Sequence, residues 1–434
     1  MANPAAKVFY IAFTDCAVFP PYNGMMKTAL FLVLGFGSFA QALEVHEWGT
    51  FTVLSGSNGA QVPWYASAAD LARLPDFVSR SPLSKAGYST VRMETPVIYF
   101  YPEKEMEVSI EVAFSGGNVT ETFPHGSGGG AIHVPMAGTE PPKTRWKGTL
   151  HPPTDKVALA EIPAIPDSKD PEPYGAAREV PEAWIFESDL KEIPGLQVQP
   201  HFPQMEKFIF YRGAGNAYIP MSAAMEGDDV TVTNSGGEAI PFAVALRVRG
   251  AKAAWISLPQ IPGRPVNGQP AMNQSRIDFP KAERPLDEVE SELAAEWKRT
   301  LAADGLTPAE ASAMVETWRK TWFRESGDRI LTLVPRNVTD AMLPLKITPA
   351  PEKTTRVFVA RIEMLSPDRE EQLISLMNPT KAVDAKDFEK LSGLGLGRFR
   401  YGARGIASQI QVNRMNDKFF ELVRFGENLE TTAR

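Results

Sequence analysis

The stretch ALEVHEWGTFTVLSG, residues 42–56, has the composition of a β-strand, because β-branched and aromatic residues fill it and Gly56 ends it. Alternate side chains of a strand point to opposite faces of a sheet. One face would carry Val45, Glu47, Phe51 and Val53, and the other His46, Trp48, Thr50 and Thr52. His46 and Glu47 could therefore reach the same ligand only if a β-bulge, for which Gly49 is the candidate position, reorients one of them.

Similar segments follow up to about residue 260. Strand-like runs with turn residues at their ends recur at TPVIYFY (95–101), MEVSIEVAF (106–114), KFIFYRG (207–213), DDVTVTN (228–234) and PFAVALRV (241–248). The sequence NSGG at 234–237 is typical of a hairpin turn. We therefore predict an antiparallel β-sandwich over residues 43–260.

Residues 135–203 interrupt this pattern with a proline-rich excursion that includes EPPKTRW, HPPTDK and DPEPYG. Such a tract is usually an irregular surface segment. A long excursion inside a domain can also form the wall of a binding site. The composition favours the surface loop.

The period of the apolar residues changes at about residue 285. Two amphipathic helices are predicted over 286–323 as a helical hairpin, the second opening with Thr307 as N-cap, Pro308 at N1 and Glu310 at N3. Strands are predicted at 329–335, 343–348 and 356–365, and helices at 366–377, 384–391 and 406–425. The fold class is thus mainly β, with an α+β part over 285–434.

The N-terminus carries an export signal. Lys27 precedes the apolar run 28–36, and Ala40-Gln41-Ala42 has the small residues that signal peptidase reads. We predict that 1–42 is a leader and signal peptide, with Met1, Met25 or Met26 as the start, and that cleavage falls near Ala42. The protein would then be soluble in the periplasm or secreted, without a transmembrane anchor, since no later segment is long and apolar enough to span a bilayer.

Charge and cysteine content narrow the class of protein further. The formal net charge of −7 provides no broad basic surface, which argues against nucleic acid as a partner. The only cysteine, Cys16, lies in the predicted leader, so the stability of the mature chain must come from burial of its core and not from disulfides.

Glu47 is the first candidate for chemistry, because an ionised carboxylate on an apolar strand face needs a partner. A structural ion pair with Arg212, at the end of another strong strand, is the favoured hypothesis. The alternative is that Glu47 and Glu94 act as the acid and base of a glycosidase, which requires a suitable separation of the two carboxyl groups.

Four histidines are candidate metal ligands: His46, His125, His133 and His201. None belongs to a compact zinc motif, so a metal site would need histidines that are far apart in sequence to converge in space. Trp48, Arg212 and Asn216 are candidate ligand-binding residues; a tryptophan could stack on a sugar, although burial in the core is its usual role. The sequence does not identify a cofactor.

Several blocks of this sequence resemble those of a group of uncharacterised exported bacterial proteins. They are HEWGTFTVL, METPVIYFY, RILTLVPRNVTDAMLPLKITP and RVFVARIEMLSPDREEQ, which together span most of the mature chain. The resemblance implies export and a shared architecture. The group has no assigned activity, so no catalytic residue can be carried over from it.

Two hypotheses of function remain open at this point. The first is a non-catalytic exported protein that binds a glycan or another envelope protein, supported by the lack of a compact catalytic motif. The second is an exported hydrolase, using either the paired carboxylates or a metal held by the scattered histidines. Close approach of the candidate carboxylates or histidines would favour the hydrolase, whereas a sealed ion pair at Glu47 would favour the binding protein.

Overall fold

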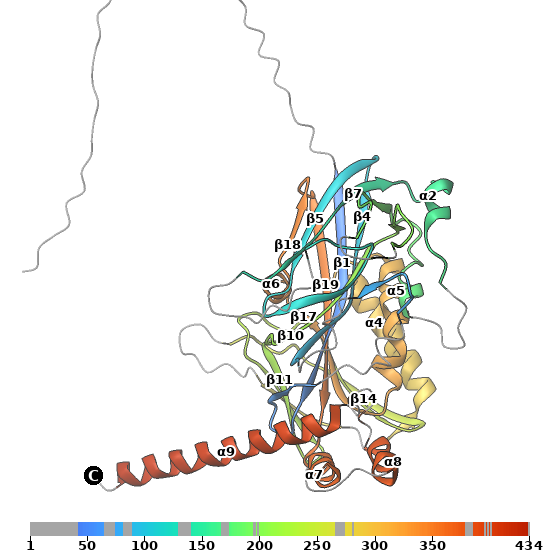
Figure 1. Ribbon diagram of the computed structural model, residues 1–434. Helices are drawn as coiled ribbons and strands as arrows, with labels where there is room; N and C mark the ends of the chain where they lie inside the picture. The colour runs from blue at the N-terminus through green and yellow to red at the C-terminus, as the bar shows by residue number, and fades with distance from the viewer. Residues whose placement is uncertain are drawn as a thin grey trace, which may run out of the picture. The chain divides into compact units, whose positions relative to one another are not determined.

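The structure is a computed structural model that describes residues 42–64, 74–80, 89–128, 140–165, 173–193, 197, 199–264, 274–279, 282–377, 385–394, 396, 399 and 402–432. It is mainly β, and most of its helices lie in the C-terminal part (Figure 1). The predicted signal peptide, Cys16 and His133 fall outside these ranges. Within them, none of the helices has the length and hydropathy needed to span a membrane.

The described strands form one large sheet of 11 strands, whose centre is β1. In spatial order they are β16 (Arg284–Pro285), β14 (Lys252–Leu258), β13 (Ala243–Arg249), β17 (Gly327–Val334), β19 (Lys353–Met364), β1 (Leu43–Ser55), β4 (Val91–Pro102), β10 (Ile209–Gly215), β6 (Gly117–Phe123) and β3 (Ser79–Arg80), with β2 (Gln61–Val62) paired to β1. The opening segment of the chain is therefore a central strand, with its side chains covered on both faces.

The pairing of β1 differs on its two sides. It runs antiparallel to β4, as a sandwich would require, but parallel to β19 near the other end of the chain. Figure 1 shows β1 and β19 side by side. Strands from 43–260 and from 285–434 thus alternate in one sheet, because β17 and β19 lie between β13 and β1.

Two smaller antiparallel sheets accompany the large one. The first contains β18 (Leu345–Thr348), β5 (Met106–Ala113), β7 (Lys143–His151), β8 (Ile185–Ser188) and β9 (Met205–Glu206), and the second contains β11 (Met221–Glu226), β12 (Asp229–Asn234) and β15 (Gln274–Asp278). Both contribute apolar side chains to a cluster shared with the large sheet, which we call the inter-sheet cluster and which includes Val45, Phe51, Ile110, Tyr211 and Val232.

Helices cover the opposite face of the large sheet. On this face lie α3 (Pro173–Ala176), α4 (Leu286–Ala303), α5 (Pro308–Arg319), the π-helix η1 (Lys320–Arg324), α7 (Pro367–Leu376), α8 (Ala385–Gly393) and α9 (Ala403–Thr432). Two helices lie elsewhere: α2 (Lys156–Glu161) packs against β8 and β9, and α6 (Arg336–Met342) contributes Met342 to the inter-sheet cluster. Side chains of α4, α5 and η1 pack with Trp48, Val97 and Phe210 in the helix-side cluster, and those of α7, α8 and α9 pack with Leu54 and Trp64 in the C-terminal cluster.

The alternation predicted for residues 45–53 is confirmed by this layering. Val45, Phe51 and Val53 belong to the inter-sheet cluster, whereas Trp48 belongs to the helix-side cluster. The predicted capping box is also present: Thr307 Oγ1 accepts a hydrogen bond from the Glu310 amide, and Glu310 accepts one from the Thr307 amide.

The proline-rich excursion contains more regular structure than the predicted surface loop. Residues 143–151 form β7, which lies between β5 and β8 in the five-stranded sheet. Its side chains alternate between buried and exposed, with Trp146 on the buried face. The two-residue alternation of β7 is short and lies close to prolines. The surface-loop prediction was based on the proline content of the whole tract, which conceals so short a pattern.

Candidate functional site

His46 lies in a buried polar contact between β1 and the start of α5. Its Nδ1 is 2.8 Å from Glu310 Oε2, and the Tyr101 hydroxyl donates to Glu310 Oε1 at 2.7 Å. His46 is 4% exposed, and burial together with the charge of Glu310 raises the pKa of Tyr101 well above its ordinary value. Because Glu310 also caps α5, this contact fixes the helix against the sheet and identifies a structural role for His46.

Glu47 is sealed in the inter-sheet layer. Its carboxylate accepts hydrogen bonds from the Tyr211 hydroxyl and from Arg356 Nε, and Arg356 Nη1 donates to Asp340 at 2.7 Å. The side chain of Glu47 is fully buried, and that of Arg356 is 2% exposed. Burial opposes the charge of Arg356, but the adjacent Glu47 holds the pKa of the guanidinium above its usual range.

The hypothesis that Arg212 is the partner of Glu47 is wrong. On β10, Tyr211 points into the inter-sheet layer, so Arg212, the next residue, points to the opposite face. Arg212 Nη2 instead donates to Thr95 Oγ1 at 3.0 Å. The missed residue, Arg356, could have been noticed as a lone cation at the start of the apolar run VFVA.

Glu94 does not form an acid–base pair with Glu47. It pairs in register with Thr50 and accepts a hydrogen bond from Thr52 Oγ1 at 2.6 Å, which places it on the helix side of the sheet. Glu47 points to the other side, so the sheet itself separates the two carboxylates. Glu94 is brought instead towards Arg212, since Arg212 bonds to Thr95, the next residue of the strand.

The other predicted ligand-binding residues are structural. Trp48 is completely buried and packs against Tyr99, with ring centroids 6.2 Å apart, so it offers no face to a sugar. Asn216 follows β10, and its Oδ1 accepts a hydrogen bond from the Thr90 amide at 3.2 Å. This contact anchors a loop to the beginning of β4.

The described histidines do not converge. His201 Nε2 is 3.0 Å from Glu161 in an exposed pair, His46 contacts Glu310, and His125 lies at a groove on the five-stranded sheet. Within the described ranges no group of three or more histidine, cysteine, aspartate or glutamate side chains could hold a metal ion. The arrangement therefore supplies no support for a metal site at these residues.

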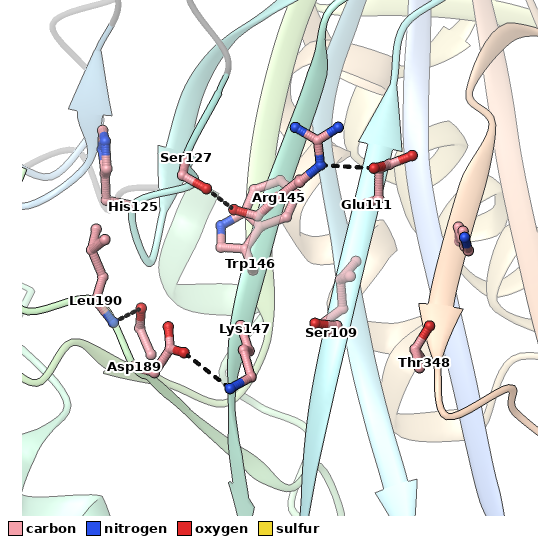
Figure 2. Close-up of a pocket in the computed structure, with 13 residues that line it drawn as sticks. Ser109, Glu111, His125, Ser127, Arg145, Trp146, Lys147, Asp189, Leu190 and Thr348 are labelled. Carbon is pink, nitrogen blue, oxygen red and sulfur yellow. Dashed lines mark hydrogen bonds and ion pairs between the residues drawn. The ribbon is translucent and has the colours of Figure 1, made fainter.

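A groove of about 370 Å³ lies on the outer face of the five-stranded sheet (Figure 2). Strands β5, β7, β8 and β18 and the segments after β6 and β8 provide its lining residues: Ser109, Ile110, Glu111, His125, Ser127, Arg145, Trp146, Lys147, Ser188, Asp189, Leu190, Lys346 and Thr348. Hydroxyl and charged groups thus predominate on this surface, because Ile110 and Trp146 have their side chains in the inter-sheet cluster on the other face of the sheet.

Ion pairs order most of the charges in this groove. Arg145 Nε donates to Glu111 at 2.8 Å, and Lys147 Nζ lies 3.7 Å from Asp189; both pairs are marked in Figure 2. The third cation of the groove, Lys346, has no ion-pair partner within the described residues. The three cations and two carboxylates that line the groove therefore leave an excess of one positive charge. Burial lowers the pKa of His125 below its ordinary value, which favours the neutral imidazole.

Comparisons with known proteins provide little further guidance. No family model matches the chain, and no curated protein matches it. Among solved structures, the Fcho1 mu homology domain of Danio rerio with bound Eps15 peptide is similar over 75% of this chain and 97% of that chain, at 6% sequence identity and a TM-score of 0.28. A similarity at this level carries no argument about fold or function.

Proposed function

We propose that this chain is an exported binding protein and that the groove on the five-stranded sheet holds its ligand. The observation that carries the proposal is the concentration of hydrogen-bonding groups around a 370 Å³ cavity on an open sheet face. Binding sites typically combine a concave surface with a few orienting polar groups. The pre-formed ion pairs of Arg145 and Lys147 would hold these groups in place before the ligand arrives.

The ligand of this groove is proposed to be an acidic glycan. Lys346 supplies an amine for a carboxylate, and hydroxyls of Ser109 and Thr348 lie near it, since these two residues pair in register on β5 and β18. Sugar hydroxyls would bond to the serine hydroxyls and to Glu111. An acidic segment of another envelope protein offers fewer hydroxyl groups and is the second candidate partner.

The proposed location is the periplasm or the exterior of the cell. The apolar run 28–36 and the Ala40-Gln41-Ala42 sequence support export, and the first described strand begins at Leu43, directly after the predicted cleavage point. The hydrolase alternative has less support, because Glu47 is sealed by Arg356 and faces away from Glu94.

Binding of oligogalacturonate, measured by isothermal titration calorimetry, tests the proposal. Lys346→Ala should weaken binding about tenfold, because one charge-assisted contact contributes on the order of 1.4 kcal/mol. Lys252→Ala, at an exposed lysine on β14, is the matched control and should leave affinity unchanged. If the wild-type protein does not bind, or if both variants bind alike, the groove is not an acidic-glycan site; binding of an acidic peptide instead would favour the protein partner.

A further inference from the structure

Four adjacent strands of the large sheet lose their regular register at one level. The register shifts between Trp48 and Thr50 on β1 against β4, between Phe210 and Gly213 on β10 against β4, and between Arg212 and Gly213 on β10 against β6. The neighbouring pairs β1–β19 and β17–β19 continue without a shift. Bulges occur frequently beside functional sites, where they redirect side chains.

The backbone is strained at the same level. Thr95 has a φ of 48°, and it is the one non-glycine residue with positive φ in the described chain. A β-branched residue rarely adopts this conformation, so the surrounding structure must impose it. Thr95 is 1% exposed and accepts hydrogen bonds from Arg212, which holds the distorted segment next to Glu94.

Four polar side chains on the helix side of the sheet form what we call the bulge row: Thr50, Glu94, Arg212 and Glu121. Thr50 pairs with Glu94 across β1 and β4, and Arg212 pairs with Glu121 across β10 and β6. Thr50 and Glu121 are 0% and 3% exposed. Even so, Thr50 Oγ1 and Glu121 Oε1 have no hydrogen-bond partner among the described residues.

Buried polar atoms without partners are costly, and natural proteins seldom retain them unless a water molecule or ligand satisfies them. The bulge row is reached from solvent, because Glu94 and Arg212 are only partly buried. It lies between the helix-side cluster, which includes Phe210, and the C-terminal cluster, which begins at Leu54. The two groups of helices therefore leave a polar strip between them.

We propose that the bulge row is a second binding site and that it takes a neutral, hydroxyl-rich ligand, namely a sugar unit of a glycan. Glu94 and Glu121 provide acceptors for sugar hydroxyls, whereas Arg212 and Thr50 provide donors. Arg92, two positions before Glu94 on the same face of β4, balances the second carboxylate, so the row together with Arg92 carries no net charge and does not favour a charged ligand. This ligand class differs from that of the positively charged groove, and the proposal does not depend on the groove.

Calorimetric titration of the full mature chain with four neutral hexasaccharides tests this site: those of cellulose, xylan, starch and chitin. At least one should bind, and Glu94→Gln should weaken its binding tenfold or more. Glu226→Gln removes a carboxylate at the exposed end of β11 and is the matched control. Lys346→Ala, in the groove, should also leave this affinity unchanged.

A second variant separates binding from folding. Thr50→Val keeps the shape of the side chain and removes the hydroxyl that lacks a partner, so its melting temperature should equal or exceed that of the wild type. Its affinity for the neutral hexasaccharide should fall at least threefold. The proposal is overturned if no hexasaccharide binds the wild type, or if Glu94→Gln and Thr50→Val bind as tightly as Glu226→Gln.

Discussion

Removal of Arg356 should destabilise the protein strongly. In Arg356→Met the carboxylate of Glu47, which is fully buried, keeps only the Tyr211 hydroxyl as a hydrogen-bond donor within the described chain. Breaking a buried ion pair by removing one partner typically costs about 3–5 kcal/mol, because the remaining charge stays desolvated. We expect a loss of this size in the free energy of unfolding, measured by urea denaturation at neutral pH.

Arg336→Met is the matched control for this experiment. Arg336 bonds to the same Asp340 carboxylate at 2.8 Å, but its side chain is 45% exposed. Water can replace an exposed contact, so this variant should lose no more than about 1 kcal/mol. A difference between the two variants then reports burial of the charge and not merely the loss of a guanidinium beside Asp340.

A double variant tests the reasoning from the other direction. Replacing both partners, in Glu47→Leu with Arg356→Met, removes the uncompensated charge and should recover most of the stability lost by the single arginine variant. Two results would contradict this reasoning. The first is a free energy of unfolding for Arg356→Met within about 1 kcal/mol of the wild type. The second is a double variant whose loss of stability exceeds the sum of the losses of the two single variants.

Three further changes test other parts of the fold. Gly49→Ala should lower the free energy of unfolding by about 1–3 kcal/mol in urea, since its Cβ would lie 2.7 Å from Phe358 Cε1; no loss would show that the ring moves aside. Thr95→Gly should be about 1 kcal/mol more stable than Thr95→Ala by the same assay, because both lack the hydroxyl and only glycine accepts a φ of 48° freely; equal stability would exclude strain. Burial works to raise the pKa of Asp328, but Arg249 and neighbouring arginines lower it below its ordinary value. The stabilising effect of the ionised Asp328 is therefore complete above the unfolded pKa of about 3.9, and it is lost as the pH falls from there towards the folded pKa. Asp328→Asn should accordingly be less stable than the wild type at pH 7, and the difference should shrink below about pH 4; a constant difference would rule out this linkage.

Local patterns in the sequence predicted several features correctly. The two-residue period of 45–53 separated the residues of β1 into the faces that they occupy, and the order Thr307-Pro308-Ala309-Glu310 predicted the cap of α5. Both features depend on residues within a few positions of one another. Short-range geometry of this kind is encoded directly by the spacing of side chains.

The partner of Glu47 depends on pairing between distant parts of the chain. Glu47 and Arg356 are 309 positions apart and meet only because β1 runs parallel to β19. Arg212 was an equally reasonable cation from composition alone, and a change of one position on β10 reverses the face to which it points. The same limitation applies to Glu121, which lies beside Arg212 only because β6 pairs with β10.

The two faces of the large sheet give its two central glutamates different roles. On the inter-sheet face, apolar residues from three sheets surround Glu47, so a charge there can persist only with Arg356 and Tyr211 as partners. On the helix side, two separate groups of helices cover the sheet and leave Glu94 partly exposed between them. A ligand can therefore reach Glu94 but not Glu47. The search for activity should therefore begin at Glu94 and the open groove, while His46, Glu47 and Trp48 should be treated as the residues that hold the sheet and helices together.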